Sequence, residues 1–267
     1  MKDAVLILGA RGSVPVHLST CLRYGGATTC VLVRLAGQSV VLDAGTGILA
    51  LNDVLPEGER DLPLLVSHPH VDHLLGLPMC APVFDPQQRF RVYAAPHGGL
   101  DARAQLCTLL SPPLWPVGTD QLPARIDFHT IDGSFSLGPV QVDVMEGVHP
   151  GGVTLFRLSG GGKRVVFVTD CTLTDNLLPE LTEFARGCDL LLCDGQYSDE
   201  EWPARSTFGH STWTAAARLG AACGAKRVRI IHHDPDRTDD MLDQFTPQLL
   251  SIHKCCAFAR AGEEIPL

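Results

Sequence analysis

The sequence has no apolar run that reaches the ~20 residues of a membrane-spanning helix. Its ten cysteines include no CxxC pair, and Cys255 and Cys256 are adjacent, which is a poor arrangement for a disulfide. Positive charge is scarce, because 21 Lys and Arg against 30 Asp and Glu give a net charge of −9. These features argue against a membrane protein, a disulfide-stabilised secreted protein and a protein with a large nucleic-acid surface.

The residues that are present describe a folded globular protein. The chain has 267 residues, of which 45% are hydrophobic and 19% charged, and this is ample for a packed core. Its first residues include Asp3 and run directly into a strand-like segment, unlike a signal peptide. We therefore expect a cytoplasmic protein with reduced thiols, folded as one domain over residues 1–267.

Short β-branched runs alternate with stretches of helical periodicity along the whole chain. The strands are predicted at 4–9, 29–35, 39–42, 62–67, 90–94, 140–145, 153–158, 164–169, 190–193 and 227–231. The clearest helices are predicted at 175–186, 211–222 and 239–259. Two batches of strands, each with helices appended, favour an α/β fold of two face-to-face sheets with helices outside. Composition alone does not distinguish this four-layer arrangement from a doubly wound sheet.

The most informative motif directly follows the apolar run 62–66. It reads His-x-His-x-Asp-His and comprises His68, His70, Asp72 and His73. Three imidazoles and a carboxylate at such spacing are typical of zinc-type ligands, and a helix-capping turn explains them less well. His68 and His70 alternate along extended backbone, whereas Asp72 and His73 can reach a second ion. The motif therefore predicts a two-metal centre.

A two-metal centre requires further ligands, which we expect at the ends of later strands. His149 follows the strand 140–145, Asp170 follows 164–169 and His232 follows 227–231. A carboxylate such as Asp170 can bridge two ions, whereas an imidazole has only one available lone pair. Asp43, after the strand 39–42, is expected to bond a ligand imidazole and fix its tautomer.

These motifs resemble the metallo-β-lactamase superfamily, specifically its phosphodiesterase branch of tRNase Z-like and cyclic-phosphate phosphodiesterase-like proteins. The resemblance also rests on the segments 42–47 (LDAGTG), 209–212 (GHST) and 231–235 (IHHDP). It implies a four-layer αββα sandwich and two divalent ions, one held by His68, His70 and His149 and the other by Asp72, His73 and His232, with Asp170 bridging. His233 is the alternative to His232, which is preferred because its place after the strand matches the family position.

The GHST segment separates phosphodiester chemistry from the other reactions of this fold. In tRNase Z-like relatives a histidine at the position of His210 faces the scissile phosphate, and Asp194 matches its acidic partner. Asp72, Asp194 and His210 are therefore the expected catalytic residues, and Ser211 and Thr212 are expected to bind substrate. The alternative is that His210 begins a helix capped by Ser211 or Thr212.

The loop 9–13 offers exposed amides and Arg11 as a further substrate contact, with a plain turn as the equal alternative. Arg11 carries the only cationic side chain of this loop. A guanidinium there could meet the charge of a phosphodiester.

The resulting hypothesis is a dinuclear hydrolase of a small cyclic or nucleotide-like phosphodiester, with a 3′,5′-cyclic nucleotide as first choice and a metal-bridging hydroxide as nucleophile. Zinc is the default ion, and manganese or iron also fits the ligands. The alternatives are tRNA 3′-end processing, a carbon-ester or thioester hydrolase and a non-catalytic scaffold. The expected partner is the small substrate; membrane binding is not expected, nucleic acid is disfavoured by the charge, and the resemblance favours a homodimer.

Overall fold

Two mixed β-sheets form the centre of the molecule in the computed structural model, which describes residues 2–267. The first sheet has the order β14-β1-β2-β3-β4-β5-β6 and the second β13-β12-β11-β10-β9-β8-β7. Counted from β14 in the first sheet and from β7 in the second, three antiparallel pairings are followed by three parallel ones. The two halves of the chain thus repeat one strand pattern, and the C-terminal strand β14 returns to the edge of the first sheet.

The strands of the first sheet are β1 (Ala4–Gly9), β2 (Cys30–Leu35), β3 (Gln38–Leu42), β4 (Asp61–Val66), β5 (Arg89–Ala94), β6 (Arg125–Thr130) and β14 (Glu264–Pro266). Those of the second are β7 (Phe135–Leu137), β8 (Val140–Gly147), β9 (Val153–Gly160), β10 (Lys163–Val168), β11 (Leu190–Asp194), β12 (Val228–Ile231) and β13 (Cys256–Phe258). The α-helices are α1 (Leu51–Val54), α2 (Ala102–Leu109), α3 (Leu178–Phe184), α4 (Trp202–Arg205), α5 (Trp213–Cys223) and α6 (Asp239–Ile252). Short 3₁₀ turns cover Ser19–Cys21, Thr46–Ala50, Val71–His73, Leu77–Met79, Ala81–Phe84 and Thr119–Gln121.

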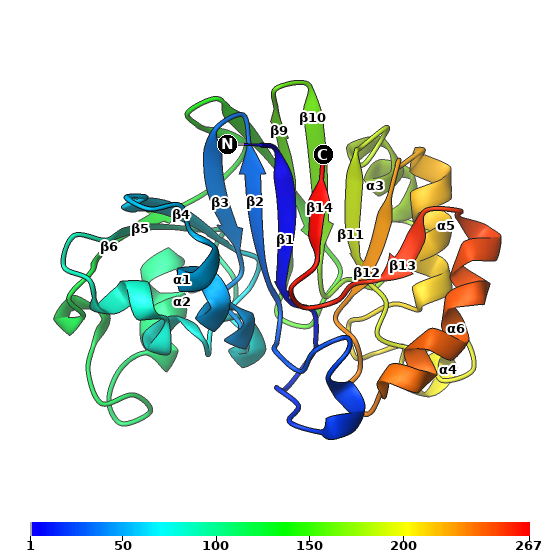
Figure 1. Ribbon diagram of the computed structural model, residues 1–267, viewed down its shortest axis with the longest axis horizontal. Coiled ribbons are helices and arrows are strands. Elements are labelled where there is room, and N and C mark those ends of the chain that lie inside the picture. Colours follow the sequence, from blue (N-terminus) through cyan, green and yellow to red (C-terminus); the bar gives the residue numbers. More distant parts are fainter. Residues whose placement is uncertain (1) are drawn as a thin grey trace.

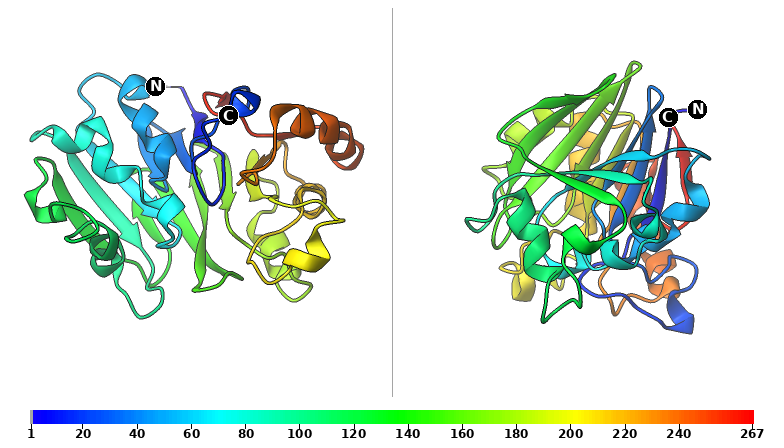
Figure 2. Two further views of the ribbon diagram at one scale, coloured as in Figure 1. Left: turned by 90° about the horizontal axis from the view of Figure 1, so that it is seen from below. Right: turned by 90° about the vertical axis from the view of Figure 1, so that its left-hand side faces the viewer.

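Three apolar layers hold these elements together. One lies between the sheets and includes Val33, Phe156 and Phe167. A second packs α1, α2 and the 3₁₀ turns on the outer face of the first sheet, and a third packs α3, α5 and α6 on the second. Figures 1 and 2 show helices outside both sheets. The predicted αββα sandwich is therefore confirmed.

The inner strands are buried on both faces because a sheet covers one side and helices the other. β4, for example, is buried from Leu62 to Val66, which explains its unbroken apolar run. All ten predicted strands are present within two residues of their expected bounds. Among residues 2–267, no helix is long and apolar enough to span a bilayer.

One helix prediction is wrong at its C-terminal end. The helix expected over 239–259 ends at Ile252, and the chain then forms β13, which pairs in parallel with β12. Cys256 and Phe258 are buried while Ala257 between them is half-buried, so this segment has the alternation of a strand. The tertiary pairing with β12 overrides its helical periodicity. The structure also contains three strands that the sequence pattern does not predict, β6, β7 and β14.

Candidate metal centre

The predicted ligands meet at one edge of the sandwich, where strands of both sheets end. The motif His68 to His73 follows β4, His149 follows β8, Asp170 follows β10 and His232 follows β12. Asp170 and His232 have positive φ angles of 45° and 61°, in the left-handed region that non-glycine residues rarely adopt. Such strain costs about 1–3 kcal/mol per residue and is typical of functional sites.

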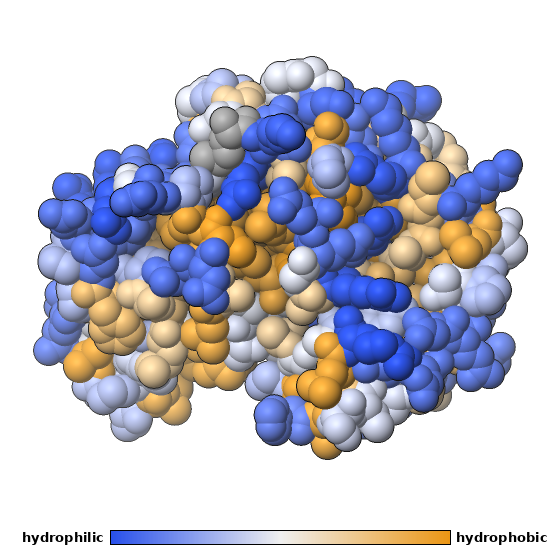
Figure 3. Space-filling view, in the orientation of Figure 1, coloured by the Kyte–Doolittle hydropathy of each residue, from blue (hydrophilic) through white to orange (hydrophobic). Residues whose placement is uncertain are grey.

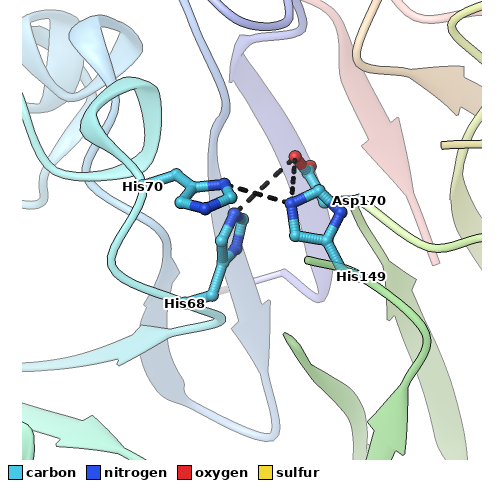
Figure 4. A group of neighbouring side chains, drawn as sticks. All are labelled: His68, His70, His149 and Asp170. Atoms are coloured by element: carbon cyan, nitrogen blue, oxygen red, sulfur yellow. Dashed lines mark hydrogen bonds and ion pairs between the residues drawn. The ribbon is translucent and has the colours of Figure 1, made fainter. Parts of the chain in front are cut away.

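The first cluster contains His68, His70, His149 and Asp170, whose ligand atoms all lie within 4.8 Å of one another. Figure 4 shows the three imidazoles and the carboxylate turned toward a common point. The Nδ1 atom of His70 lies 3.0 Å from Nε2 of His149. The Asp170 Oδ2 atom lies 3.7 Å from Nε2 of His68 and 3.9 Å from Nε2 of His149.

The second cluster contains Asp72, His73, Asp170 and His232. Nε2 of His73 lies 3.2 Å from Oδ2 of Asp72 and 3.2 Å from Oδ1 of Asp170. Nε2 of His232 also lies 3.2 Å from a carboxylate oxygen of each aspartate. Asp170 therefore belongs to both clusters, which is the position that a bridging carboxylate requires.

Hydrogen bonds behind the clusters fix which imidazole nitrogen points inward. Nδ1 of His73 donates to Asp43 Oδ2 over 2.7 Å, so the predicted bond from Asp43 to an imidazole is present. Nδ1 of His149 donates to the carbonyl of Gly209 over 2.9 Å, and Nδ1 of His232 faces Gln196 Oε1 at 3.2 Å. Because Nδ1–H donates to these acceptors, the lone pair of each neutral ring lies on the inward Nε2 atom.

The buried polar atoms of this site fit a divalent cation. Nε2 of His68 and Nε2 of His73 are both buried without a hydrogen-bond partner. Such atoms are costly in a folded protein unless they bind an ion or water. The imidazole and carboxylate donors suit zinc, manganese or iron. The described residues therefore present ligand sets for two ions that share Asp170.

Burial and the carboxylates act in opposite directions on the imidazoles. Burial lowers the pKa of His68, His70 and His149, which keeps these rings neutral and able to ligate. At His232 burial also opposes the charge, but Asp170 and Asp72 outweigh it and raise the pKa to about 9. The two carboxylates of the second cluster thus favour positive charge beside them, either as a proton on His232 or as a bound cation.

His210 and Asp194 lie beside these clusters as an interacting pair. Nδ1 of His210 donates to Asp194 Oδ2 over 2.8 Å, so Nε2 remains free to face a ligand. Asp194 also accepts hydrogen bonds from the backbone amides of Gln196 and Cys171, at 3.0 and 3.3 Å. The ring of His210 stacks on His232 with 4.7 Å between centroids. The structure therefore brings the predicted pair against the second metal cluster.

Comparison with known proteins agrees with this geometry. The model of the family described as "Beta-lactamase superfamily domain" matches residues 38–233. The chain belongs to this superfamily.

Ribonuclease Z of Bradyrhizobium sp. (strain ORS 278) is 24% identical over 290 residues, covering 88% of this chain and 91% of the relative. The probable metallo-hydrolase YhfI of Bacillus subtilis (strain 168) is 24% identical over 232 residues, 85% of this chain and 86% of YhfI. Its crystal structure has a TM-score of 0.75 at 18% identity and covers 99% of both chains. A diphosphatase from the PhnP family has a TM-score of 0.72 at 17% identity, over 100% of this chain and 98% of that one. The protein is a metallo-β-lactamase-fold hydrolase.

The expectation that Arg11 contacts substrate is corrected by the structure. Its guanidinium is fully buried and donates to the carbonyl oxygens of Gly25, Asp234 and Arg237. Burial lowers the pKa of this side chain. Arg11 therefore connects its own loop to the segments of Gly25 and of Asp234 to Arg237 through backbone carbonyls.

Ser211 and Thr212 also take structural positions instead of the expected substrate contacts. The Ser211 hydroxyl donates to the carbonyl of Cys171 and accepts from the amide of Leu173. Thr212 is the N-cap of α5 and accepts from the amide of Ala215. The capping alternative thus applies to Thr212, while His210 itself faces the metal clusters.

His233 is directed away from the metal clusters. Its Nε2 atom donates to the carbonyl of Ala259 over 2.9 Å, and Tyr24 and Phe258 pack edge-on against its ring. His232 turns inward because its φ of 61° reverses the side-chain direction at the end of β12. The adjacent histidines therefore have separate roles, and His232 supplies the ligand-type nitrogen.

Three supporting residues were not identified from the sequence. Ser67 bonds Asp43 through its amide and hydroxyl, and its oxygen lies 3.0 Å from Nδ1 of His68. Gln196 links Nδ1 of His232 to the Ser13 hydroxyl, and the amide of Ser13 donates to Asp72 over 2.9 Å. Their proximity to strand ends was the only available signal, because neutral polar residues are common in loops.

Proposed function

We propose that this protein is a phosphodiesterase with two divalent metal ions that cleaves a compact phosphodiester, with a 3′,5′-cyclic nucleotide as the first candidate substrate. The His210–Asp194 pair beside the double cluster carries this proposal. A proton donor assists the departure of the alkoxide oxygen of a phosphodiester, whereas the thiolate of a thioester can leave without one.

In the proposed enzyme His68, His70 and His149 hold one ion, and Asp72, His73 and His232 hold the other, with Asp170 as the shared ligand. Zinc is the first candidate because the first set contains three imidazoles and the second contains two. Bound divalent ions supply positive charge at the phosphate and lower the pKa of coordinated water to about 7. Asp43, Ser67 and Gln196 keep the ligand nitrogens of their histidine partners turned inward.

His210 acts on the leaving group in this proposal. Asp194 accepts a hydrogen bond from Nδ1–H, so the ring presents Nε2 to the substrate in a fixed orientation. A proton on Nε2 stabilises negative charge on the departing oxygen and then transfers to it. The two backbone amides that bond Asp194 hold the carboxylate in place while the imidazole changes its charge.

Processing of tRNA 3′ ends is the second candidate. The Ribonuclease Z relative supports it, since its match extends over most of both chains. The net charge of −9 weighs against it, because affinity for a polyanion comes largely from clustered Lys and Arg. We therefore rank a small substrate above a precursor tRNA.

One assay set separates these candidates. Protein loaded with Zn²⁺ or Mn²⁺ is incubated with bis(p-nitrophenyl) phosphate, a panel of 3′,5′-cyclic nucleotides and a precursor tRNA. We expect turnover of the small diesters and little cutting of the tRNA. Efficient tRNA cleavage would reverse the ranking, and inactivity on every diester would refute the proposal.

A further inference from the structure

Four apolar side chains close in sequence to residues of the metal centre are exposed. Val71 lies between His70 and Asp72, and Val148 precedes His149. Phe208 lies two residues before His210, and Val14 follows Ser13, whose amide bonds Asp72. Their exposed fractions are 52% for Val71, 44% for Val148, 55% for Phe208 and 53% for Val14. We call Val14, Val71, Val148 and Phe208 the apolar rim.

Contacts between the neighbours of these residues connect the four segments around one site. Nδ1 of His70 lies 3.0 Å from Nε2 of His149, which brings the segments of Val71 and Val148 together. His149 bonds the carbonyl of Gly209, which directly follows Phe208. Figure 3 shows the lower edge of the molecule hollowed between two lobes, and β1 and β3 run toward this side in Figure 1.

The charge of the rim segments is unusual for a site that receives an anion. The rim segments are the stretches of chain that carry the apolar rim, namely residues 12–18, 67–79, 145–153 and 206–212. They contain no lysine or arginine, and Glu146 adds a negative charge. Arg205 precedes the last segment, but it bonds Asp234 over 3.2 Å and lies over the Tyr197 ring at 5.1 Å. These segments therefore offer apolar surface where a polyanion would require several cations.

We infer that the preferred substrate is a compact phosphodiester with a single negative charge and apolar, aromatic or aliphatic, groups near the reacting phosphate. This inference rests on the proposed phosphodiesterase function and specifies its substrate class. The metal ions and His210 stabilise the single negative charge of the phosphate, while the apolar rim removes the apolar groups of the substrate from water. A second negatively charged phosphate finds no free cation on the rim segments.

The test compares two singly charged esters that share one leaving group. Bis(p-nitrophenyl) phosphate carries a second aromatic ring, whereas methyl p-nitrophenyl phosphate carries only a methyl group. Phe208→Ser and Val148→Ser should each lower kcat/KM for the bis ester by about five- to twentyfold, from the lost burial of one side chain. For the methyl ester the decrease should stay below about twofold, since little apolar area is buried. Leu250→Ser, at an exposed position in the last turn of α6, is the control and should leave kcat/KM unchanged for both esters.

The outcomes separate this inference from the proposed function. If the metal-loaded wild type hydrolyses neither ester, the phosphodiesterase proposal fails and this inference fails with it. If the wild type is active but both variants affect the two esters equally, or match Leu250→Ser, only the rim inference is refuted. A higher kcat/KM for precursor tRNA than for the bis ester would also refute it. Light scattering measures the molar mass in solution as a last check. If the wild type is a dimer and Val148→Ser is a monomer, the apolar rim binds a second copy of the chain and the substrate inference is refuted.

Discussion

Replacing Asp43 by asparagine should weaken metal binding without unfolding the protein. Asp43 is fully buried directly after β3 and reaches the metal centre through hydrogen bonds to His73 and Ser67. Its Oδ2 atom accepts from His73 Nδ1 and the Ser67 hydroxyl, at 2.7 and 2.8 Å, and Oδ1 accepts from the Ser67 amide at 2.7 Å. All three partners are donors, so the site needs a group with two acceptor atoms.

Asparagine has nearly the same shape but supplies only one acceptor oxygen. In either orientation its NH₂ group must face at least one of the three donors. Asparagine also tolerates the left-handed backbone that Asp43 adopts at φ 56°, so the substitution adds little strain. The lost charge-assisted hydrogen bond is worth about 1.5–3 kcal/mol. Transmitted through His73, this corresponds to an affinity for the second ion lower by about 10- to 100-fold.

The assay is a titration of the metal-free protein with Zn²⁺ in competition with a chromophoric chelator. Asp53→Asn, at an exposed position on α1, is the matched control and should bind as the wild type does. Circular dichroism and urea unfolding should show that Asp43→Asn remains folded. If a folded Asp43→Asn protein binds both ions within twofold of the wild-type affinity, Asp43 does not position His73.

Three further substitutions test other parts of the centre. His210→Ala should lower kcat by about 10²–10⁴-fold for a diester with an alkyl leaving group, and less for p-nitrophenolate, which leaves without a proton; unchanged metal content is expected, and equal losses on both esters would contradict the proton-donor role. Arg11→Lys should lower the free energy of unfolding by about 2–4 kcal/mol in urea titrations, because an ammonium group cannot reach all three carbonyls, while KM stays unchanged. Burial lowers the pKa of His233 to about 3. Below about pH 6.5 His233 is therefore protonated in the unfolded chain but stays neutral in the folded protein. The contribution of neutral His233 to the free energy of unfolding is complete above pH 6.5 and falls by about 2 kcal/mol between pH 6.5 and pH 5. His233→Gln should reduce this pH dependence of the free energy of unfolding, measured by urea titrations at pH 7 and pH 5.

The sequence predicts the metal ligands well because their spacing reflects local geometry. His68 to His73 follow one strand directly, and the parallel strands that carry Asp170 and His232 end at the same edge of the second sheet. Apolar runs show where strands end, so the residues at this edge of the sandwich can be predicted without knowing which strands pair. The same reasoning located Asp43, which stands in the corresponding place after β3.

Predictions failed where a role depends on contacts between distant segments. Arg11 looked available for substrate, but the carbonyls that bind it include two from residues 234 and 237, more than 200 positions away. Gln196 carries no charge or motif, so only the folded structure shows its contact with His232. The strand β13 was hidden within a helical pattern because its partner β12 lies on a different segment of the chain.

The metal content of the purified protein tests the two-ion centre most directly. After reconstitution with Zn²⁺ and removal of loosely bound metal, elemental analysis should give two equivalents per chain. Anomalous diffraction from crystals of the same preparation should locate one ion among His68, His70 and His149 and the other among Asp72, His73 and His232, both beside Asp170. Less than one tightly bound equivalent, or ions located away from Asp170, would contradict the two-ion centre.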